Sequence, residues 1–254
     1  MLIDTHSHIY SEEFIEDIDE VVSRAYDNDV RKIVMPNIDS SSVRKMLDLA
    51  DQYPQICFPL MGLHPTSVGD DYKEELELVE YWLKKRKFYG IGEIGIDLYW
   101  ENTFLEEQMI AFRHQVNLAK EYKLPIVIHV RESFDQVYTV LKEENNEELN
   151  GVFHSFTGTL DQAKSIFDLG FKIGVGGIVT FKNSGLDQVI SQIDPKNMLL
   201  ETDAPYLTPV PFRGKRNESS YLIHIARRIA ELHNTSVNEI AKITTKNAIN
   251  LFGI

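Results

Sequence analysis

Short apolar runs alternate with longer amphipathic stretches along the whole chain. The short runs are bounded by turn residues, as is typical of buried strands. There are eight of them: Leu2–Ile3, Lys32–Met35, Phe58–Met61, Tyr89–Ile91, Ile126–Ile128, Gly151–Phe153, Lys172–Val175 and Met198–Leu200. The amphipathic stretches predict helices at Phe14–Asp29, Ser42–Gln52, Glu74–Arg86, Phe104–Tyr122, Phe134–Glu144, Leu160–Leu169, Leu186–Gln192 and Ser220–Leu232. Because buried strands and helices alternate eight times, the pattern predicts an α/β fold, a (β/α)₈ TIM barrel with a parallel sheet.

The helical periodicity is clearest in the fourth amphipathic stretch, where apolar residues recur every three or four positions. They are Leu105, Met109, Phe112, Val116 and Ala119, which form one apolar face. Ser40 to Ser42 and Thr159 are candidate helix caps. Val237–Phe252 predicts one or two extra C-terminal helices packed on the outside. We expect one domain over residues 1–254, with a doubly wound open sheet as the alternative architecture.

Composition and charge narrow the class of protein. The 254 residues are 43% hydrophobic and 26% charged, as in ordinary globular proteins. The single cysteine, Cys57, lies in an apolar run, so we expect a buried thiol and no internal disulfide. The chain shows no signal peptide and no bilayer-spanning apolar run, which favours the cytoplasm. The sequence does not fix an oligomeric state and is compatible with a monomer.

A net charge of −13 argues against broad electrostatic capture of nucleic acid. It does not exclude a polyanionic substrate, because bound divalent cations make their own positive field.

Histidines and carboxylates gather where predicted strands end. They are His6, His8, Glu93, His129, His154 and Asp203, with His64 after the third strand. In a barrel, the carboxyl ends of the strands form the face that carries the active site. His6 and His8 are two residues apart, so in an extended segment both imidazoles point to one side. Burying this group without partners would be costly, so the pattern predicts a metal centre.

The motifs around these residues resemble the signature blocks of the TatD family of metal-dependent deoxyribonucleases. The blocks are Asp4-Thr5-His6-Ser7-His8, Gly62-Leu63-His64-Pro65, Gly92-Glu93-Ile94-Gly95-Ile96-Asp97, Ile128-His129-Val130-Arg131, His154-Ser155-Phe156-Thr157-Gly158 and Glu201-Thr202-Asp203-Ala204-Pro205-Tyr206-Leu207. They occur in the family's order and cover nearly the whole chain.

The resemblance implies a TIM barrel with two divalent ions that hydrolyses phosphodiesters of DNA, in the 3′-to-5′ direction on single strands, and sometimes of RNA. It implies that His6, His8 and Asp203 hold one ion, that His129 and His154 hold the other, and that Glu93 bridges them. Local chemistry agrees, because a carboxylate can bridge two cations and a neutral imidazole cannot. Two such ions activate water for an in-line displacement, which makes Glu93 and Asp203 the predicted catalytic residues. Mixed nitrogen and oxygen ligands suit zinc, manganese or iron better than magnesium, with which the family is commonly assayed.

Weaker candidates surround this group. His64, Arg131 and Arg213 are predicted substrate-binding residues, with a structural turn, a rim salt bridge and a solvated loop as their respective alternatives. Asp4 and Asp97 either orient ligating imidazoles or make ordinary hydrogen bonds at the barrel end.

The remaining aromatic and histidine residues receive simpler interpretations. Tyr99 and Trp100 could stack on a base, although packing under their loop is the favoured interpretation. His114, His224 and His233 fall on predicted helices and are interpreted as surface or structural residues.

Two other functions compete with a nuclease. A binuclear amidohydrolase acting on lactones, amides or phosphoesters uses the same barrel, but its ions are typically bridged by a modified lysine where this chain has Glu93. An inactive metal- or partner-binding barrel is the other alternative, and the intact ligand set argues against it. A hydrolase of aminoacyl-nucleic-acid esters would use the same chemistry.

Overall fold

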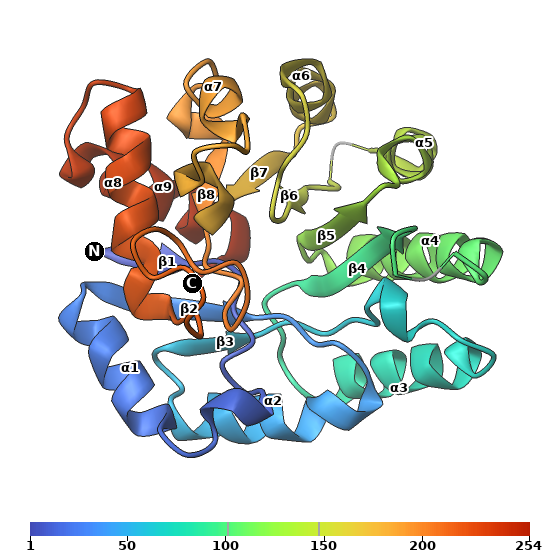
Figure 1. Ribbon diagram of the computed structural model, residues 1–254. Coiled ribbons are helices and arrows are strands. Elements are labelled where there is room, and N and C mark those ends of the chain that lie inside the picture. Colours follow the sequence, from blue (N-terminus) through green and yellow to red (C-terminus); the bar gives the residue numbers. More distant parts are fainter. Residues whose placement is uncertain (101, 147) are drawn as a thin grey trace.

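Eight parallel strands follow one another in chain order around a ring (Figure 1). A computed structural model describes residues 1–100, 102–146 and 148–254. The strands are β1 Leu2–Asp4, β2 Val30–Met35, β3 Cys57–Pro59, β4 Ile91–Asp97, β5 Ile126–Arg131, β6 Gly151–Phe153, β7 Lys172–Val175 and β8 Met198–Leu200. This order matches the predicted (β/α)₈ barrel and excludes the doubly wound sheet, in which the strand order reverses.

Backbone hydrogen bonds join the two continuous ladders, β1 to β3 and β4 to β8, into a ring. On one side the Gly92 amide donates to the Met61 carbonyl at 2.9 Å. On the other side the Thr5 amide donates to Leu200 at 3.0 Å, and the Asp203 amide donates to His6 at 2.9 Å. The second junction brings the chain segments that carry His6 and Asp203 side by side, although they are almost two hundred residues apart.

Helices surround the ring and cover its outer face (Figure 1). They are α1 Ile18–Asp27, α2 Ser40–Gln52, α3 Tyr72–Lys85, α4 Leu105–Tyr122, α5 Phe134–Glu144, α6 Leu160–Asp168, α7 Leu186–Ile190, α8 Leu222–Leu232 and α9 Val237–Phe252. The predicted boundaries differ mainly where 3₁₀ turns precede a helix, at Glu12–Phe14 and Ser219–Tyr221. In the part of the chain that the structure describes, no helix is both long and apolar enough to cross a bilayer.

Local side-chain chemistry sets several helix starts. Thr159 caps α6 as predicted, with a reciprocal bond from Gln162. The cap of α2 is Asp39 rather than the serines, because its carboxylate accepts from the amides of Ser41 and Ser42. The serines occupy the first helical turn instead. Cys57 is buried, and burial raises the pKa of its thiol to about 12.

The end of the barrel at which the strands begin is filled with apolar side chains and covered by α9. Inward residues from successive strands form one buried cluster with α9: Ile3, Val34, Phe58, Leu60, Val127, Val152, Leu199, Ala248 and Phe252. Asn247 on α9 also donates to the carbonyls of Pro195 and Met198 at the start of β8. The C-terminal helix therefore lies outside the ring of strands and covers their amino-terminal ends.

Candidate metal centre

The side chains that point into the barrel are apolar along the strands and polar where the strands end, so they form a polar cluster at the carboxyl end of the barrel. Side chains two positions apart on a strand point to the same side. His129 follows the inward Val127 by two residues, and His154 stands in the same relation to Val152. The same residues that pack the barrel core therefore fix the direction of these imidazoles.

Glu93 lies within β4 rather than at its end, because β4 runs on to Asp97. The ladder between β4 and β5 is irregular between Ile91 and Ile94, and the Gly92–Glu93 peptide bond is cis. Gly95 pairs with His129, and a Cβ on Gly95 would lie 2.0 Å from the His129 carbonyl oxygen. A glycine at this point allows β4 to approach β5 closely where the site is built.

The two oxygens of the Glu93 carboxylate face two different sets of histidines. Its Oε2 lies 3.0 Å from His6 Nε2 and 3.6 Å from His8 Nε2. Its Oε1 lies 2.7 Å from His129 Nδ1 and 2.9 Å from His154 Nε2. The carboxylate is almost fully buried, with 3% of its side chain exposed. Glu93 is thus the centre on which the cluster converges.

His6, His8 and Asp203 form a compact group on the Oε2 side. Their ligand atoms all lie within 4.8 Å of one another. The two Nε2 atoms are 3.2 Å apart, and Asp203 Oδ1 lies 3.8 Å from the first and 3.9 Å from the second. Asp203 has a positive φ of 57°, a conformation that aspartate tolerates better than most residues. Donor atoms bound to one ion at about 2.1 Å have comparable mutual distances.

In His8 and His129, one ring nitrogen faces Glu93 and the other forms a hydrogen bond outside the cluster. That outer bond leaves a lone pair on the nitrogen that faces Glu93. Tyr10 donates its hydroxyl to the Pro36 carbonyl at 2.6 Å, so it accepts from His8 Nδ1 at 2.9 Å. His129 Nε2 lies 2.8 Å from Asp97 Oδ2, and a carboxylate accepts this bond. With the proton on the outer nitrogen, His8 Nε2 and His129 Nδ1 present lone pairs to the site. Asp97 therefore orients an imidazole, one of the two alternatives that the sequence left open.

His64 has the opposite tautomer. Its Nδ1 accepts from the Thr66 backbone amide at 3.1 Å, so a neutral ring carries its proton on Nε2. That nitrogen lies 3.2 Å from Glu93 Oε1 and 3.3 Å from His129 Nδ1. Position alone would make His64 a ligand together with Glu93 and His129. Its Nε2–H makes it a hydrogen-bond donor instead.

Glu201 is a buried member of the site for which the sequence alone predicted no role. It follows the inward Leu199 by two residues, and that alternation was the available signal. Its Oε1 lies 3.4 Å from His154 Nδ1 and also accepts from the Ser155 amide. Gly174 on β7 leaves room for it, because a Cβ there would lie 2.1 Å from Glu201 Oε2.

Burial and mutual charge set the protonation of the cluster. Burial lowers the pKa of His6 well below its ordinary value, and nearby His154 adds to the effect. Burial alone would raise the pKa of Glu93, but the surrounding histidines outweigh it and hold that pKa well below the ordinary value. Burial opposes a charged His129, yet its bonds to Asp97 and Glu93 raise its pKa. Cations bound here would compete with protons, so their affinity should fall as the pH falls.

The other candidates lie in different surroundings. Asp4 accepts from the Thr202 amide at 2.9 Å and its hydroxyl at 2.6 Å, so it braces the β1–β8 junction rather than an imidazole ring. Arg213 lies over the Phe181 ring at 3.8 Å, on the loops after β7 and β8 and outside the histidine cluster. The predicted structural histidines on the helices make local contacts, such as His114 with Glu80 at 3.0 Å and His233 with the Ile190 carbonyl at 3.1 Å.

One interpretation of the rim residues was wrong. Tyr99 and Trp100 are not packed under their loop, because they are 51% and 68% exposed. Arg131 lies over both rings, and among residues 1–100, 102–146 and 148–254 it has no ion-pair partner.

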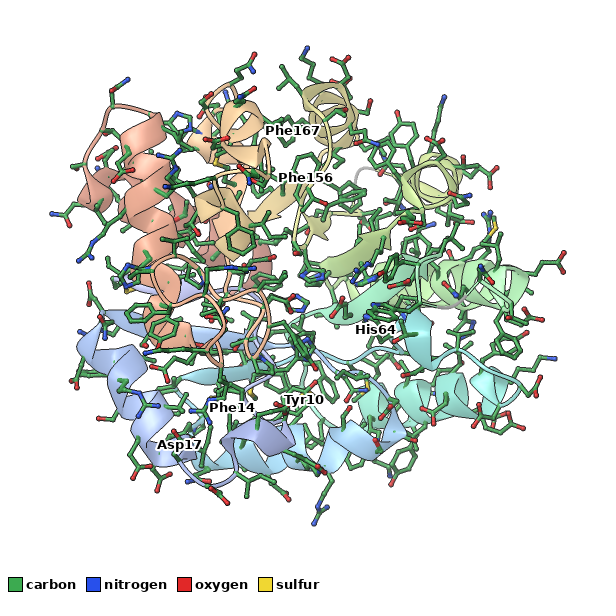
Figure 2. All side chains as sticks on the ribbon, viewed as in Figure 1. Tyr10, Phe14, Asp17, His64, Phe156 and Phe167 are labelled. Carbon is green, nitrogen blue, oxygen red and sulfur yellow. The ribbon has the colours of Figure 1, made fainter. Side chains whose placement is uncertain are left out.

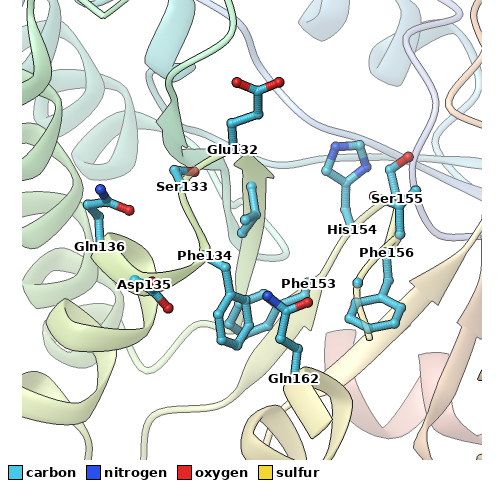
Figure 3. Close-up of a pocket in the computed structure, with 13 residues that line it drawn as sticks. Glu132, Ser133, Phe134, Asp135, Gln136, Phe153, His154, Ser155, Phe156 and Gln162 are labelled. Carbon is cyan, nitrogen blue, oxygen red and sulfur yellow. The ribbon is translucent and has the colours of Figure 1, made fainter. Parts of the chain in front are cut away.

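A cavity opens beside His154, between the segments that follow β5 and β6 (Figure 3). Its walls include Glu132 and Ser133 from the first segment and Ser155 and Phe156 from the second. In Figure 2, Tyr10 and His64 lie on the segments that follow β1 and β3. The cluster therefore has space next to it for a bound molecule.

The donor set fits divalent cations. Imidazole nitrogens with free lone pairs and buried carboxylate oxygens are the ligands that zinc, manganese and iron prefer. The ligand atoms are already gathered within 4.8 Å around His6, His8 and Asp203, and around His6, Glu93 and His154. Fold and cluster together define a metal-dependent hydrolase built on a β/α barrel.

Comparison with known proteins identifies the family. The model of the TatD related DNase family matches residues 3–253. The uncharacterized metal-dependent hydrolase YabD of Bacillus subtilis is 40% identical over the full length of both chains. The crystal structure of the TatD homologue YjjV from Escherichia coli superposes with a TM-score of 0.94, at 32% identity, covering 100% of this chain and 98% of that one. A TatD family hydrolase from Entamoeba histolytica has a TM-score of 0.85 at 25% identity, covering 99% and 97%. The chain belongs to the TatD family of metal-dependent hydrolases.

Proposed function

We propose that the protein is a two-metal phosphodiester hydrolase that degrades DNA, acting on single strands from the 3′ end. The observation that carries the proposal is the position of Glu93, whose Oε2 faces His6 and His8 while its Oε1 faces His129 and His154. A carboxylate in this position can serve two cations at once. The family name, TatD related DNase, supports DNA as the substrate.

The histidines and carboxylates divide into two ligand sets. His6, His8 and Asp203 would hold one ion, His129 and His154 would hold the other, and Glu93 would contact both. Bound divalent ions would lower the pKa of a water molecule and stabilise the oxygens of an in-line displacement at phosphorus. The ligand chemistry favours zinc, manganese or iron over magnesium.

Two further side chains would act directly on the reacting groups. Asp203 lies among the histidines with 14% of its side chain exposed, and its carboxylate would accept the proton of an attacking water. His64 carries an Nε2–H beside Glu93, so it would donate to a phosphate oxygen or to the leaving oxygen.

Glu93 also distinguishes the proposal from an amidohydrolase. In the binuclear barrels that act on lactones and amides, a modified lysine typically joins the ions, whereas Glu93 occupies that position here. Within the described residues, the side chains within ion-pair distance of Glu93 are all histidines: His6, His8, His64, His129 and His154. This set suits a phosphodiester, whose negative charge would be drawn to the cations.

Metal-dependent cleavage of labelled oligonucleotides tests the proposal. Single and double strands, labelled at the 3′ or the 5′ end, would be incubated with the metal-free protein and then with Mn²⁺, Zn²⁺ or Mg²⁺. We expect metal-dependent loss of 3′-terminal nucleotides from single strands, and no cleavage by Asp203→Asn. Lactone or amide turnover without DNA cleavage under any ion would favour the amidohydrolase alternative, and RNA cleavage alone would change the substrate.

A further inference from the structure

Two aromatic rings and a guanidinium form an exposed cluster on the rim of the barrel. Tyr99 and Trp100 follow β4 directly, and Arg131 is the last residue of β5. The rings meet edge to face, 4.8 Å apart at 90°. The Arg131 guanidinium carbon lies 4.1 Å from the centre of the Tyr99 ring and 5.3 Å from that of Trp100. We call these three residues the aromatic platform.

The platform combines exposed ring surface with the positive charge of Arg131. Trp100 is 68% exposed and Tyr99 is 51% exposed, so much of their apolar surface faces water. Arg131 has no carboxylate within ion-pair distance in the part of the chain that the structure describes. Aromatic faces beside a guanidinium attract a planar group that carries a nearby negative charge, and a nucleotide has both features.

Asp97 links the platform to the metal centre. Its Oδ1 accepts from the backbone amides of Tyr99 at 2.9 Å and Trp100 at 2.8 Å. Its Oδ2 holds His129 Nε2 at 2.8 Å. Asp97 also pairs with Arg131 in the β4–β5 ladder. One buried carboxylate therefore bonds both to the ring of a candidate ligand and to the backbone of the platform.

We propose that the aromatic platform stacks on a base of the single strand being cleaved and so positions the neighbouring phosphate at the metal centre. This inference rests on the proposed nuclease function and specifies how the substrate is recognised. Arg131 braces the rings and directs its N–H groups to the phosphate backbone. Stacking is tolerant of base identity, so the platform recognises single-stranded nucleic acid without recognising a sequence.

Abasic substrates test the platform separately from hydrolysis. A labelled single strand would be compared with two versions in which the 3′-terminal or the next nucleotide lacks its base. We expect the wild type to prefer the complete strand at one of these positions by about ten-fold in kcat/KM. Trp100→Ala should lose most of this preference, and Trp100→Phe should keep most of it because a ring remains.

Tyr26 provides a matched control. It is also exposed, at 56%, and also lies under an arginine, with the Arg31 guanidinium carbon 3.7 Å from its ring centre. Tyr26 lies near the carboxyl end of α1. That end of the helix is at the opposite end of the barrel from the site. Tyr26→Ala should keep the full preference for the complete strand.

The outcomes separate the platform from the proposed function. If the wild type cleaves no single strand with any ion, the nuclease proposal fails and the platform fails with it. If the wild type cleaves DNA but shows no preference at either position, or if Trp100→Ala keeps the preference, the platform alone is wrong. Thermal unfolding would show whether Trp100→Ala is folded, and Tyr99→Ala would repeat the test at the second ring.

Fluorescence gives a direct measure of stacking. The chain has two tryptophans, Trp82 and Trp100, and a base that stacks on Trp100 should quench its emission. In Trp82→Phe, the remaining tryptophan emission comes from Trp100. Titration of an unlabelled single strand in the presence of Ca²⁺ should quench this emission, and the abasic strand should quench it less. Equal quenching by both strands would contradict stacking, as would no quenching by either strand.

Discussion

Replacing Asp97 by asparagine should reverse the polarity of one candidate metal ligand without changing its position. The asparagine oxygen can still accept from the amides of Tyr99 and Trp100. Its NH₂ group would then face His129 Nε2, where a carboxylate oxygen now accepts at 2.8 Å. Two donors cannot bond, so the imidazole proton should move to Nδ1, the nitrogen that faces Glu93. His129 would lose the lone pair that a cation needs.

The size of the expected loss in metal affinity follows from the role of Asp97, a carboxylate that orients a candidate ligating imidazole. Loss of a hydrogen bond that orients a ligating histidine typically costs about 10–100-fold in metal affinity, or about 1.4–2.7 kcal/mol. Asp97 is fully buried and bonds to His129 on a rigid strand, so we expect a value towards the upper end. The affinity of the weaker ion would be measured by Mn²⁺ or Zn²⁺ competition with a chelator at constant pH.

Asp39→Asn is the matched control, because Asp39 also accepts backbone amides at a helix start but bonds to no imidazole. It removes the same charge and should change metal affinity much less. Thermal unfolding of the metal-free forms would show that both variants are folded. An Asp97→Asn protein that binds both ions as tightly as the Asp39→Asn protein would refute the tautomer reasoning.

Two further predictions concern stability. Tyr10→Phe leaves His8 Nδ1 and the Pro36 carbonyl without the hydroxyl that joins them, so urea unfolding of the metal-free protein should show a loss of about 1–3 kcal/mol; an unchanged midpoint would contradict this. Hydrogen bonds from Arg216 lower the pKa of Asp17 to about 2. Because this pKa is depressed, the stabilisation is complete above about pH 4 and is lost as the pH falls towards 2. Asp17→Asn should reduce the pH dependence of urea unfolding over that interval, and an unchanged slope would count against the ion pair.

The sequence predicted the order of elements because strands and helices differ in hydrophobic period. It placed the other strands within three residues at each end but only one residue of β4, and it gathered the histidines on one face. The strand ends were less certain, since β4 continues through Gly92 and Glu93 to Asp97, where glycines weaken the apolar signal.

What the sequence could not predict depends on contacts between distant segments. The tautomers of His8 and His129 are set by Tyr10 and Asp97, and neither hydrogen bond has a local signature. The role of Glu201 followed from the alternation on β8, but only once Leu199 was known to point inward. Exposure of Tyr99 and Trp100 depends on the loop course, which hydrophobicity alone predicted wrongly.

The central claim, that Glu93 joins two cations in one hydrolytic centre, is tested most directly by counting ions. Metal-free wild type and Glu93→Gln would be reconstituted with Mn²⁺ or Zn²⁺, dialysed and analysed for metal per chain, with thermal unfolding to establish that both are folded. We expect two ions per wild-type chain and fewer than two in Glu93→Gln. A wild-type chain that never holds more than one ion, or a Glu93→Gln chain that still holds two, would contradict the claim.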